Sequence, residues 1–398
     1  MINNITIYTS SDFPNGGAAE NLVRQMALGI NSLGTKVNVV LFRGHTNDKT
    51  RVNDTNIDCS YLLFEKRPEN EIIKFVELFL IILSVPISII RNRKRFKSKF
   101  IILYGIEYFY YVFPFYITGL LFNIKIYRIV TDRYPDRTIA PSWWKLLKVF
   151  FYRFQFRYFD KYLSGIICLS NYLRENAIFY GVKASKICLI PHFIDINLFC
   201  SESIKTLPFS RERIRIGLIG SLNENNGLFV LLKAFCLVKS AYSNIELCLI
   251  GSLSEEDMII SLQILGDVID SVIFIGKAHD SMIPSLLSSC DLLVIPRKSS
   301  TFAEASFPTK LGEYLSTGRP IIATEVGEIK RIFKDKRELI LVKPDSSESL
   351  KEGILFLINN KDMALRIGEC GYYWALNNIE YRNSARILLN FMNIGNKK

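Results

Sequence analysis

A lysine and a glutamate that lie one helical turn apart, Lys310 and Glu313, have the clearest potential for chemistry in this sequence. They follow an apolar run at residues 291–296 and a loop of small residues, and they fall in a predicted short helix. The first turn of a helix presents unpaired N–H groups and a positive dipole end, so a strand, a loop and a helix in this order can bind an anion. Glu313 could accept hydrogen bonds from vicinal hydroxyls. The segment therefore predicts a site for an anion and a ribose-like diol.

Glycines also precede predicted helices in two other places. Gly16 and Gly17 follow the first predicted strand, and Gly220 and Gly227 follow an apolar run at residues 214–219. Because glycine has no Cβ, backbone N–H groups in such loops can approach a ligand closely. Glycines before a helix are also ordinary turn residues. The three segments together favour a ligand site more than any one of them does alone.

Residues 307–320, Phe-Pro-Thr-Lys-Leu-Gly-Glu-Tyr-Leu-Ser-Thr-Gly-Arg-Pro, resemble the donor-binding segment of the retaining GT-B glycosyltransferases known as group 1 or family 4. The resemblance covers nearly the whole chain, and it is strongest over residues 214–325 and weak over residues 44–163. It implies that a nucleoside-diphosphate sugar binds to a set of residues spread over three segments: Gly16, Gly17, Gly220, Ser221, Asn226, Thr309, Lys310 and Glu313.

The glycine loop after residues 214–219 departs from the family pattern. Many relatives have an arginine and a lysine at the positions of Ser221 and Asn226, and both grip the diphosphate. Two neutral side chains cannot offset a charge near −2, and charge-assisted hydrogen bonds to phosphate are about twice as strong as neutral ones. We expect Arg297 and Lys298, together with Lys310, to replace the missing cations. The alternative is that Arg297 and Lys298 are surface charges in solvent.

Two carboxylates are candidates for catalysis through the same resemblance. Relatives often have two glutamates separated by seven residues, of which Glu313 matches the second. The first position falls on Ala305, so Glu304 fits only if the loop shifts by one residue, and otherwise it is a surface charge. Asp132 lies where many relatives have a histidine that contacts the donor sugar, although a capping or ion-paired aspartate fits as well. The family's reaction needs no dedicated protein base, since positioning and phosphate stabilisation would suffice.

Apolar runs alternate with helical patterns along both halves of the 398-residue chain. The predicted strands are residues 5–8, 37–42, 100–104, 126–130, 165–169 and 187–190, and then 214–219, 245–250, 272–275, 292–295, 320–324 and 339–342. Runs that are apolar on both faces are typical of parallel strands covered by helices. The predicted fold class is therefore α/β, with two doubly wound, Rossmann-like parallel-sheet domains facing a central cleft, which is the GT-B fold.

The resemblance divides these elements into three parts. Residues 1–195 would form an acceptor-binding domain, and residues 205–375 would form the domain that binds the nucleotide-sugar donor. Residues 376–398 would form a C-terminal helix that returns to the first domain. The family also implies that neither a cofactor nor a metal is needed, because its members neutralise the diphosphate with protein groups.

The positive charge of the chain is concentrated in its first half. Residues 1–200 hold 26 Lys and Arg against 15 Asp and Glu, a balance of +11, whereas the formal net charge of the whole chain is +12. Apolar stretches at residues 75–90, 108–124 and 143–161 occur in the same half. A basic run follows the first of them: Arg91, Arg93, Lys94, Arg95, Lys97 and Lys99. These stretches favour a peripheral membrane face over buried helices with a solvated basic turn. No nucleic-acid motif is present.

These observations predict a cytoplasmic retaining glycosyltransferase that is peripheral on the inner face of the plasma membrane. It would move a sugar from a nucleoside-diphosphate sugar to a lipid-linked oligosaccharide or a related acceptor, in bacterial surface-polysaccharide synthesis. Two alternatives stay open. One is a nucleotide-sugar epimerase of the same fold, and the other is a non-catalytic protein retained for binding or assembly.

Overall fold

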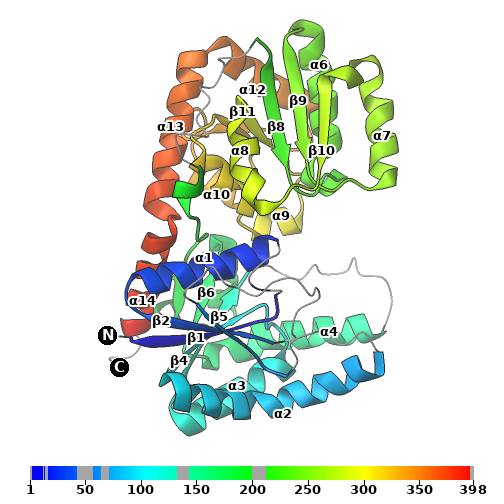
Figure 1. Cartoon of the computed structure of the whole chain (residues 1–398). Coiled ribbons are helices and arrows are strands. Elements are labelled where there is room, and N and C mark those ends of the chain that lie inside the picture. Colours follow the sequence, from blue (N-terminus) through cyan, green and yellow to red (C-terminus); the bar gives the residue numbers. More distant parts are fainter. Residues whose placement is uncertain are drawn as a thin grey trace. The chain divides into compact units, whose positions relative to one another are not determined.

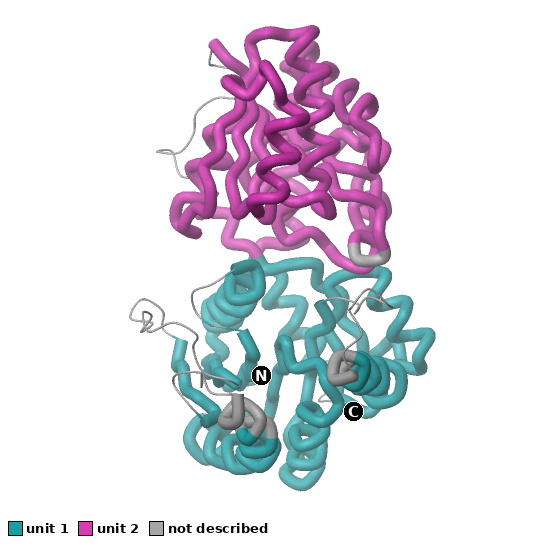
Figure 2. The backbone as a smooth tube through the Cα atoms, turned by 90° about the vertical axis from the view of Figure 1, so that its right-hand side faces the viewer, with its two compact units in different colours: residues 1–193, 381–398 teal, residues 194–380 magenta. Residues whose placement is uncertain are grey.

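The computed structural model describes residues 2–11, 13, 17–42, 57–63, 71–131, 143–199 and 212–394. The chain divides into two compact units, which Figure 2 shows in two colours. The first unit comprises residues 1–193 and 381–398, and the second comprises residues 194–380. The chain thus leaves the first unit once and returns to it for its last helix. Each unit is described below by itself.

The first unit is built on a parallel sheet in which strands follow the order β3-β2-β1-β4-β5-β6-β7. Nearly all residues of the central strands are buried, because helices cover both faces of the sheet. The order reverses between β1 and β4, which makes this point the topological switch point of the unit. The strands are β1 (Asn4–Thr9), β2 (Lys36–Leu41), β3 (Asp58–Tyr61), β4 (Phe100–Tyr104), β5 (Lys125–Val130), β6 (Gly165–Cys168) and β7 (Ile187–Leu189).

Helices lie on both faces of this sheet (Figure 1). On one face α1 (Ala18–Ser32) packs against the last helix, α14 (Tyr381–Ile394). Gly29 permits this close approach, since a Cβ there would lie 2.5 Å from the backbone oxygen of Tyr381. The other face carries α2 (Glu71–Phe96), α3 (Phe109–Phe122), α4 (Trp143–Phe154) and α5 (Asn171–Phe179), with the short turns η1 (Gln155–Phe159) and η2 (Asp160–Tyr162) after α4.

The second unit has a parallel sheet with the strand order β10-β9-β8-β11-β12-β13. Its switch point lies between β8 and β11. The strands are β8 (Ile214–Ile219), β9 (Ile245–Ile250), β10 (Val272–Gly276), β11 (Leu292–Ile295), β12 (Ile321–Thr324) and β13 (Ile340–Val342). The covering helices are α6 (Leu228–Ala241), α7 (Glu255–Leu265), α8 (Ile283–Ser288), α9 (Thr301–Ala305), α10 (Thr309–Ser316), α11 (Gly327–Ile332), α12 (Ser347–Asn359) and α13 (Lys361–Asn378).

Two doubly wound parallel sheets confirm the predicted fold class, and every predicted strand appears within one residue at each end. One strand was not predicted, and the alternative of a solvated basic turn does not hold for residues 91–95. Strand β3 was not predicted, because it is a short edge strand with no apolar alternation and no fully buried residue. The basic residues 91–95 do not form a turn, since they continue α2 as far as Phe96. Within the described residues, no helix is both long enough and apolar enough to cross a membrane.

Candidate functional site

The candidate site lies in the second unit, where the ends of β8 and β11 meet the start of α10. Gly220 directly follows β8 and has a φ of +123°, in the region that favours glycine. The side chain of Lys310, from the first turn of α10, lies directly over it, and a Cβ added at Gly220 would overlap Lys310 Nζ. The lysine and the glycine loop, which are 90 positions apart in the sequence, therefore form one site at the switch point.

The charge on Lys310 responds to its surroundings. Burial lowers its pKa to about 8; nearby Arg297 lowers the pKa as well, whereas Glu313 raises it. Arg297 itself is buried, and its Nη2 donates a hydrogen bond to Ser306 Oγ at 3.2 Å. The alternative of a solvent-exposed Arg297 is therefore wrong. Two cationic side chains that repel each other are held together here, and this arrangement favours an anion between or beside them.

Glu313 lies one turn further along α10 and is half-buried. Burial raises the pKa of its carboxyl to about 7, Lys310 lowers the pKa, and Asp280 raises it. Asp280 belongs to the short turn η8 (Asp280–Met282). Near neutral pH the carboxyl is thus poised between a form that only accepts hydrogen bonds and a form that also donates one. Thr309, the first residue of α10, is also half-buried.

Lys298, unlike Arg297, already has an acidic partner. Its Nζ lies 2.7 Å from Glu224 Oε1, and the two side chains are 35% and 62% exposed. Glu224 belongs to the turn η6 (Glu224–Asn226), between β8 and α6. The hydrogen bond that Lys298 donates to the Glu224 carboxylate is the main cause that raises the pKa of Lys298. Arg297 and Lys298, which were both expected to replace the missing cations, therefore have different surroundings.

Ser221 and Asn226, at the two positions where the family resemblance led us to expect cations, are joined by a hydrogen bond. Asn226 Nδ2 donates a hydrogen bond to the backbone oxygen of Ser221 at 2.8 Å. The backbone N–H of Asn226 donates to Asn223 Oδ1 at 3.0 Å. These bonds close the loop between β8 and α6 without any charge. The neutral pair therefore shapes the glycine loop, and the positive charges lie on Arg297 and Lys298, after β11, and on Lys310 of α10.

Sequence reasoning missed a residue that positions α10. The hydroxyl of Tyr314, a fully buried side chain, accepts a hydrogen bond from the backbone N–H of Ile219 at 2.7 Å. This bond ties the helix that carries Lys310 and Glu313 to the last residue of β8. The sequence offered only a weak signal, since Tyr314 simply continues the apolar face of the helix.

Glu304 has a structural partner. Its Oε1 accepts a hydrogen bond from the backbone N–H of Gly327, the first residue of α11, at 3.2 Å. This is the geometry of a carboxylate that satisfies a free N–H at a helix N-terminus. Asp132 and Gly16 lie outside the described residues, and Gly17 is the exposed N-cap of α1 in the first unit. The catalytic assignments of Asp132 and Glu304 stay predictions.

No group of three or more His, Cys, Asp or Glu side chains is placed to hold a metal ion in the part of the chain that the structure describes. That metal and cofactor are dispensable stays a prediction.

Comparison with known proteins agrees with this architecture. Residues 201–374 match the family described as Glycosyl transferases group 1. An uncharacterized glycosyltransferase of Methanocaldococcus jannaschii is 25% identical over 332 residues, which cover 79% of this chain and 84% of that protein. A phosphatidyl-myo-inositol mannosyltransferase of Mycobacterium leprae is 24% identical over 143 residues, 36% of each chain.

The same fold occurs in a solved structure. The crystal structure of HepE from Anabaena, in complex with UDP and glucose, matches with a TM-score of 0.71. The match covers 98% of this chain and 99% of that chain, at 16% sequence identity. At this identity the likeness is one of fold.

Proposed function

From the match of residues 201–374 to the family described as Glycosyl transferases group 1, in a chain of the GT-B fold, we propose a specific reaction. The enzyme transfers a sugar, with retention of configuration, from a nucleoside-diphosphate sugar to a lipid-linked oligosaccharide or a related acceptor. The reaction takes place at the inner face of the plasma membrane and serves bacterial surface-polysaccharide synthesis.

The observation that carries the donor assignment is the position of Lys310 over Gly220. A diphosphate on the loop after β8 would be held by Lys310 with Arg297 nearby, and charge-assisted hydrogen bonds of this kind are the strong ones. Glu313, one turn along α10, would accept hydrogen bonds from the ribose hydroxyls. The related fold of HepE, which was solved with UDP and glucose, supports the same class of donor.

The proposed chemistry relies on the leaving group. The bond between the sugar C1 and the β-phosphate oxygen breaks, and the acceptor hydroxyl oxygen forms the new bond to C1 on the same face. The acceptor proton passes to the departing phosphate oxygen, so no protein base is required. Lys310 is mostly protonated at pH 7, given its pKa of about 8, and would stabilise the negative charge that develops on the phosphate.

A panel of UDP-, GDP- and ADP-sugars tests this function directly. We expect one donor to be hydrolysed slowly without acceptor. The same donor should be consumed faster, by transfer of its sugar, with lipid extracts that contain glycolipid acceptors. The released sugar would keep the donor's anomeric configuration when the first product is observed by NMR. Release of an inverted sugar would refute retention, and recovery of an epimerised donor would favour an epimerase. Binding without any turnover would favour a non-catalytic protein.

The membrane part of the proposal is supported by apolar side chains on the outer surface of the first unit. In α2, Ile81, Val85 and Ile89 are buried against the sheet, yet Leu83 and Ile87 on the remaining surface of the helix are exposed. In α3 the exposed residues include Phe113, Leu120 and Leu121, and Leu121 is 75% exposed. Helices that are apolar on their outer surface mark a binding face.

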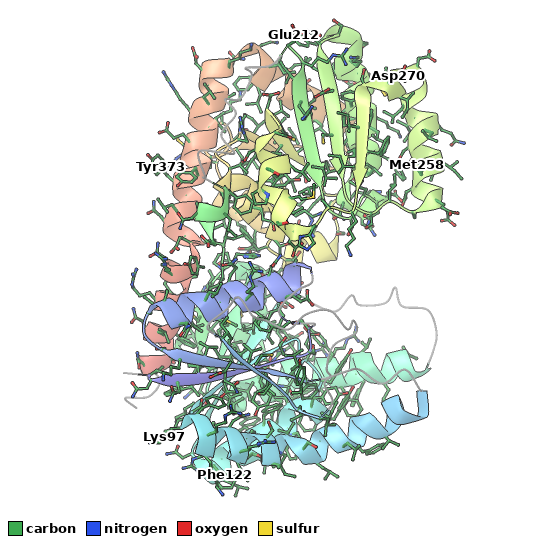
Figure 3. All side chains as sticks on the ribbon, in the orientation of Figure 1. Lys97, Phe122, Glu212, Met258, Asp270 and Tyr373 are labelled. Carbon is green, nitrogen blue, oxygen red and sulfur yellow. The ribbon has the colours of Figure 1, made fainter. Side chains whose placement is uncertain are left out.

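Basic residues adjoin this apolar surface. All six residues of the basic run, Arg91 to Lys99, are exposed. The guanidinium of Arg93 lies 5.7 Å from the centre of the Phe122 ring, so the end of α2 contacts the end of α3. Figure 3 shows Lys97 and Phe122 at this same end. No Asp or Glu occurs in residues 78–106, so an anionic surface would meet little repulsion there.

Ring contacts extend the surface toward α5. Tyr116 of α3 packs on Phe159, and Phe159 packs on Tyr162, which is 55% exposed. At the end of α5, Phe179 is 80% exposed and contacts Tyr180, which also receives the Arg157 guanidinium at 5.4 Å. Aromatic rings beside arginines suit the interfacial region of a bilayer. An acceptor anchored in a lipid membrane fits such a surface.

We expect the protein to bind vesicles that contain anionic lipid and to detach as the salt concentration rises. At physiological salt the screening length is about 8 Å, so surface attraction must weaken strongly with salt. Replacing Arg93, Lys94 and Arg95 by Gln should lower the binding free energy by at most about 3 kcal/mol, at about 1 kcal/mol per charge. Vesicle co-sedimentation measures this effect, and donor hydrolysis in solution should be unchanged.

The matched control replaces three exposed lysines of the second unit, Lys233, Lys277 and Lys330, by Gln and should leave vesicle binding nearly intact. A second variant, with Leu120 and Leu121 changed to Ser, should bind neutral and anionic vesicles less well if apolar insertion contributes. Salt-independent binding to neutral vesicles would mean that apolar insertion dominates. Absence of binding to either kind of vesicle would refute the membrane face.

A further inference from the structure

The ion pair between Lys298 and Glu224 joins the two loops of the switch point. Lys298 follows β11, whereas Glu224 lies after β8. The backbone of the two loops is also joined, because the N–H of Lys298 donates to the oxygen of Asn225 at 3.4 Å. Gly227 fits against the end of β11, where a Cβ would overlap the oxygen of Pro296. The ion pair thus sits on a backbone framework that does not depend on it.

Lys298 differs from the other two cations of the site in its freedom to move. Lys310 is held over Gly220, and Arg297 is buried against Ser306. Lys298 is partly exposed, and its flexible four-carbon stem lets the ammonium change partners. Two carboxylates act on it: Glu224, through the ion pair, and Asp345, which also raises its pKa. Asp345 already accepts a hydrogen bond from the backbone N–H of Ser299 at 3.3 Å.

We propose that Glu224 is a positioning residue that holds Lys298 beside the glycine loop. When a nucleotide binds, Lys298 leaves Glu224 and binds the diphosphate instead. This inference rests on the proposed donor site at Gly220 and Lys310. Exposed ion pairs contribute little stability, so separating this one costs little. A diphosphate carries more charge than one carboxylate and offers more acceptor oxygens, so Lys298 favours the diphosphate once a nucleotide is bound.

The exchange of Glu224 for the diphosphate as partner of Lys298 affects the affinity for the nucleotide. Glu224 competes with the nucleotide for Lys298, so it weakens diphosphate binding and aids release of the nucleoside diphosphate after transfer. With neutral Ser221 and Asn226 in the same loop, Lys298 is the exposed cation that this competition can control. The chain would thereby keep a third positive charge at the site without holding its product too tightly.

The test compares Glu224→Gln, Lys298→Gln and the double variant by calorimetry with UDP, GDP, ADP and their nucleosides. For whichever diphosphate the natural chain binds, we expect Glu224→Gln to bind it about two- to fivefold more tightly, the range for an exposed ion pair. Affinity for the nucleoside should not change. Lys298→Gln should bind the diphosphate more weakly, and the double variant should match Lys298→Gln, because Glu224 acts through Lys298.

A matched control is available in α12, where Lys351 Nζ lies 3.4 Å from Glu348 Oε2 and the side chains are 30% and 64% exposed. Glu348→Gln breaks an ion pair of similar exposure and should not alter nucleotide affinity. Unchanged or weaker diphosphate binding by Glu224→Gln would overturn the proposal. A double variant that keeps the gain would show direct repulsion of the ligand by Glu224 and would overturn it too.

If the proposed donor site itself is wrong, the calorimetry would give a different result. If none of the diphosphates binds to the natural chain, both the donor site and the part assigned to Glu224 are refuted. If a diphosphate binds and its affinity depends on Lys310 but not on Glu224, only the present inference fails.

Discussion

Replacing Lys310 by Met is expected to weaken the binding of a nucleoside diphosphate about 10- to 100-fold, with little effect on the nucleoside. The ammonium lies over Gly220, where we place the diphosphate, and hydrogen bonds to charged groups contribute about 1.5–3 kcal/mol. Methionine keeps much of the length and apolar contact of the lysine stem. Calorimetry with the diphosphate and the nucleoside separates the loss of charge from any loss of fold.

The role of Lys310 can also be tested through the pH dependence of diphosphate binding. Burial lowers its pKa to about 8, so the diphosphate affinity of the natural chain should fall as pH rises through about 8 and the ammonium loses its proton. The bound anion favours the charged amine, so the midpoint in the complex lies above that value. Lys310→Met should lack this decline, and Lys351→Met, on α12, should retain it. A decline that persists in Lys310→Met would remove Lys310 from the site.

Replacing Glu313 by Ala is expected to weaken nucleotide binding by about 1.5–3 kcal/mol, because the ribose would lose hydrogen bonds to a charged group. In contrast to Lys310→Met, this variant should lose affinity for the nucleoside as well as for the diphosphate. The comparison of the two ligands therefore distinguishes the two residues. Unchanged affinity for the nucleoside diphosphate would refute the assignment of Glu313.

The nucleoside is also the better ligand for testing Glu313 by pH, since it has no phosphate to titrate. Burial raises the pKa of the Glu313 carboxyl to about 7, so nucleoside affinity should fall as pH is lowered through about 7 and the carboxylate becomes protonated. Hydroxyls that donate to the carboxylate favour its charged form, so the midpoint in the complex lies lower. Glu313→Gln cannot titrate and should show no such fall. Its melting temperature, compared with that of the natural chain, controls for a change in folding.

The strands and their succession were predictable because their signal is local. A strand buried on both faces is mostly apolar, and the predicted strands are mostly apolar, although buried polar residues such as Asn38 and Arg128 occur in two of them. Strand β3 escaped prediction because an edge strand is only partly covered, so its residues need not be apolar. The order of strand, small-residue loop and helix around Lys310 was also readable, since it depends on residues close together in the chain.

The surroundings of individual charged side chains were not predictable in this way. Arg297 and Lys298 are adjacent, yet one is buried beside Ser306 and the other is exposed and paired with Glu224, 74 positions away. Likewise, the sequence did not show that the carboxylate of Glu304, a candidate for catalysis, would accept a hydrogen bond from the backbone N–H of Gly327 at the N-terminus of α11. A residue's own neighbours in the sequence carry no information about which distant loop will face it.

By itself, the sequence determined that this chain alternates buried strands with helices in two halves and that Lys310 and Glu313 stand on one helix beside a loop of small residues. Only the tertiary structure decided that Lys310 would lie over Gly220, that Tyr314 would fasten α10 to β8, and that Lys298 would have Glu224 as its partner. The physical reason is the reversal of strand order between β8 and β11, which brings loops about 75 to 90 positions apart to one edge of the sheet. The burial, pKa values and ion pairs of the charged side chains depend on the contact between these distant loops, so no local sequence pattern predicts them.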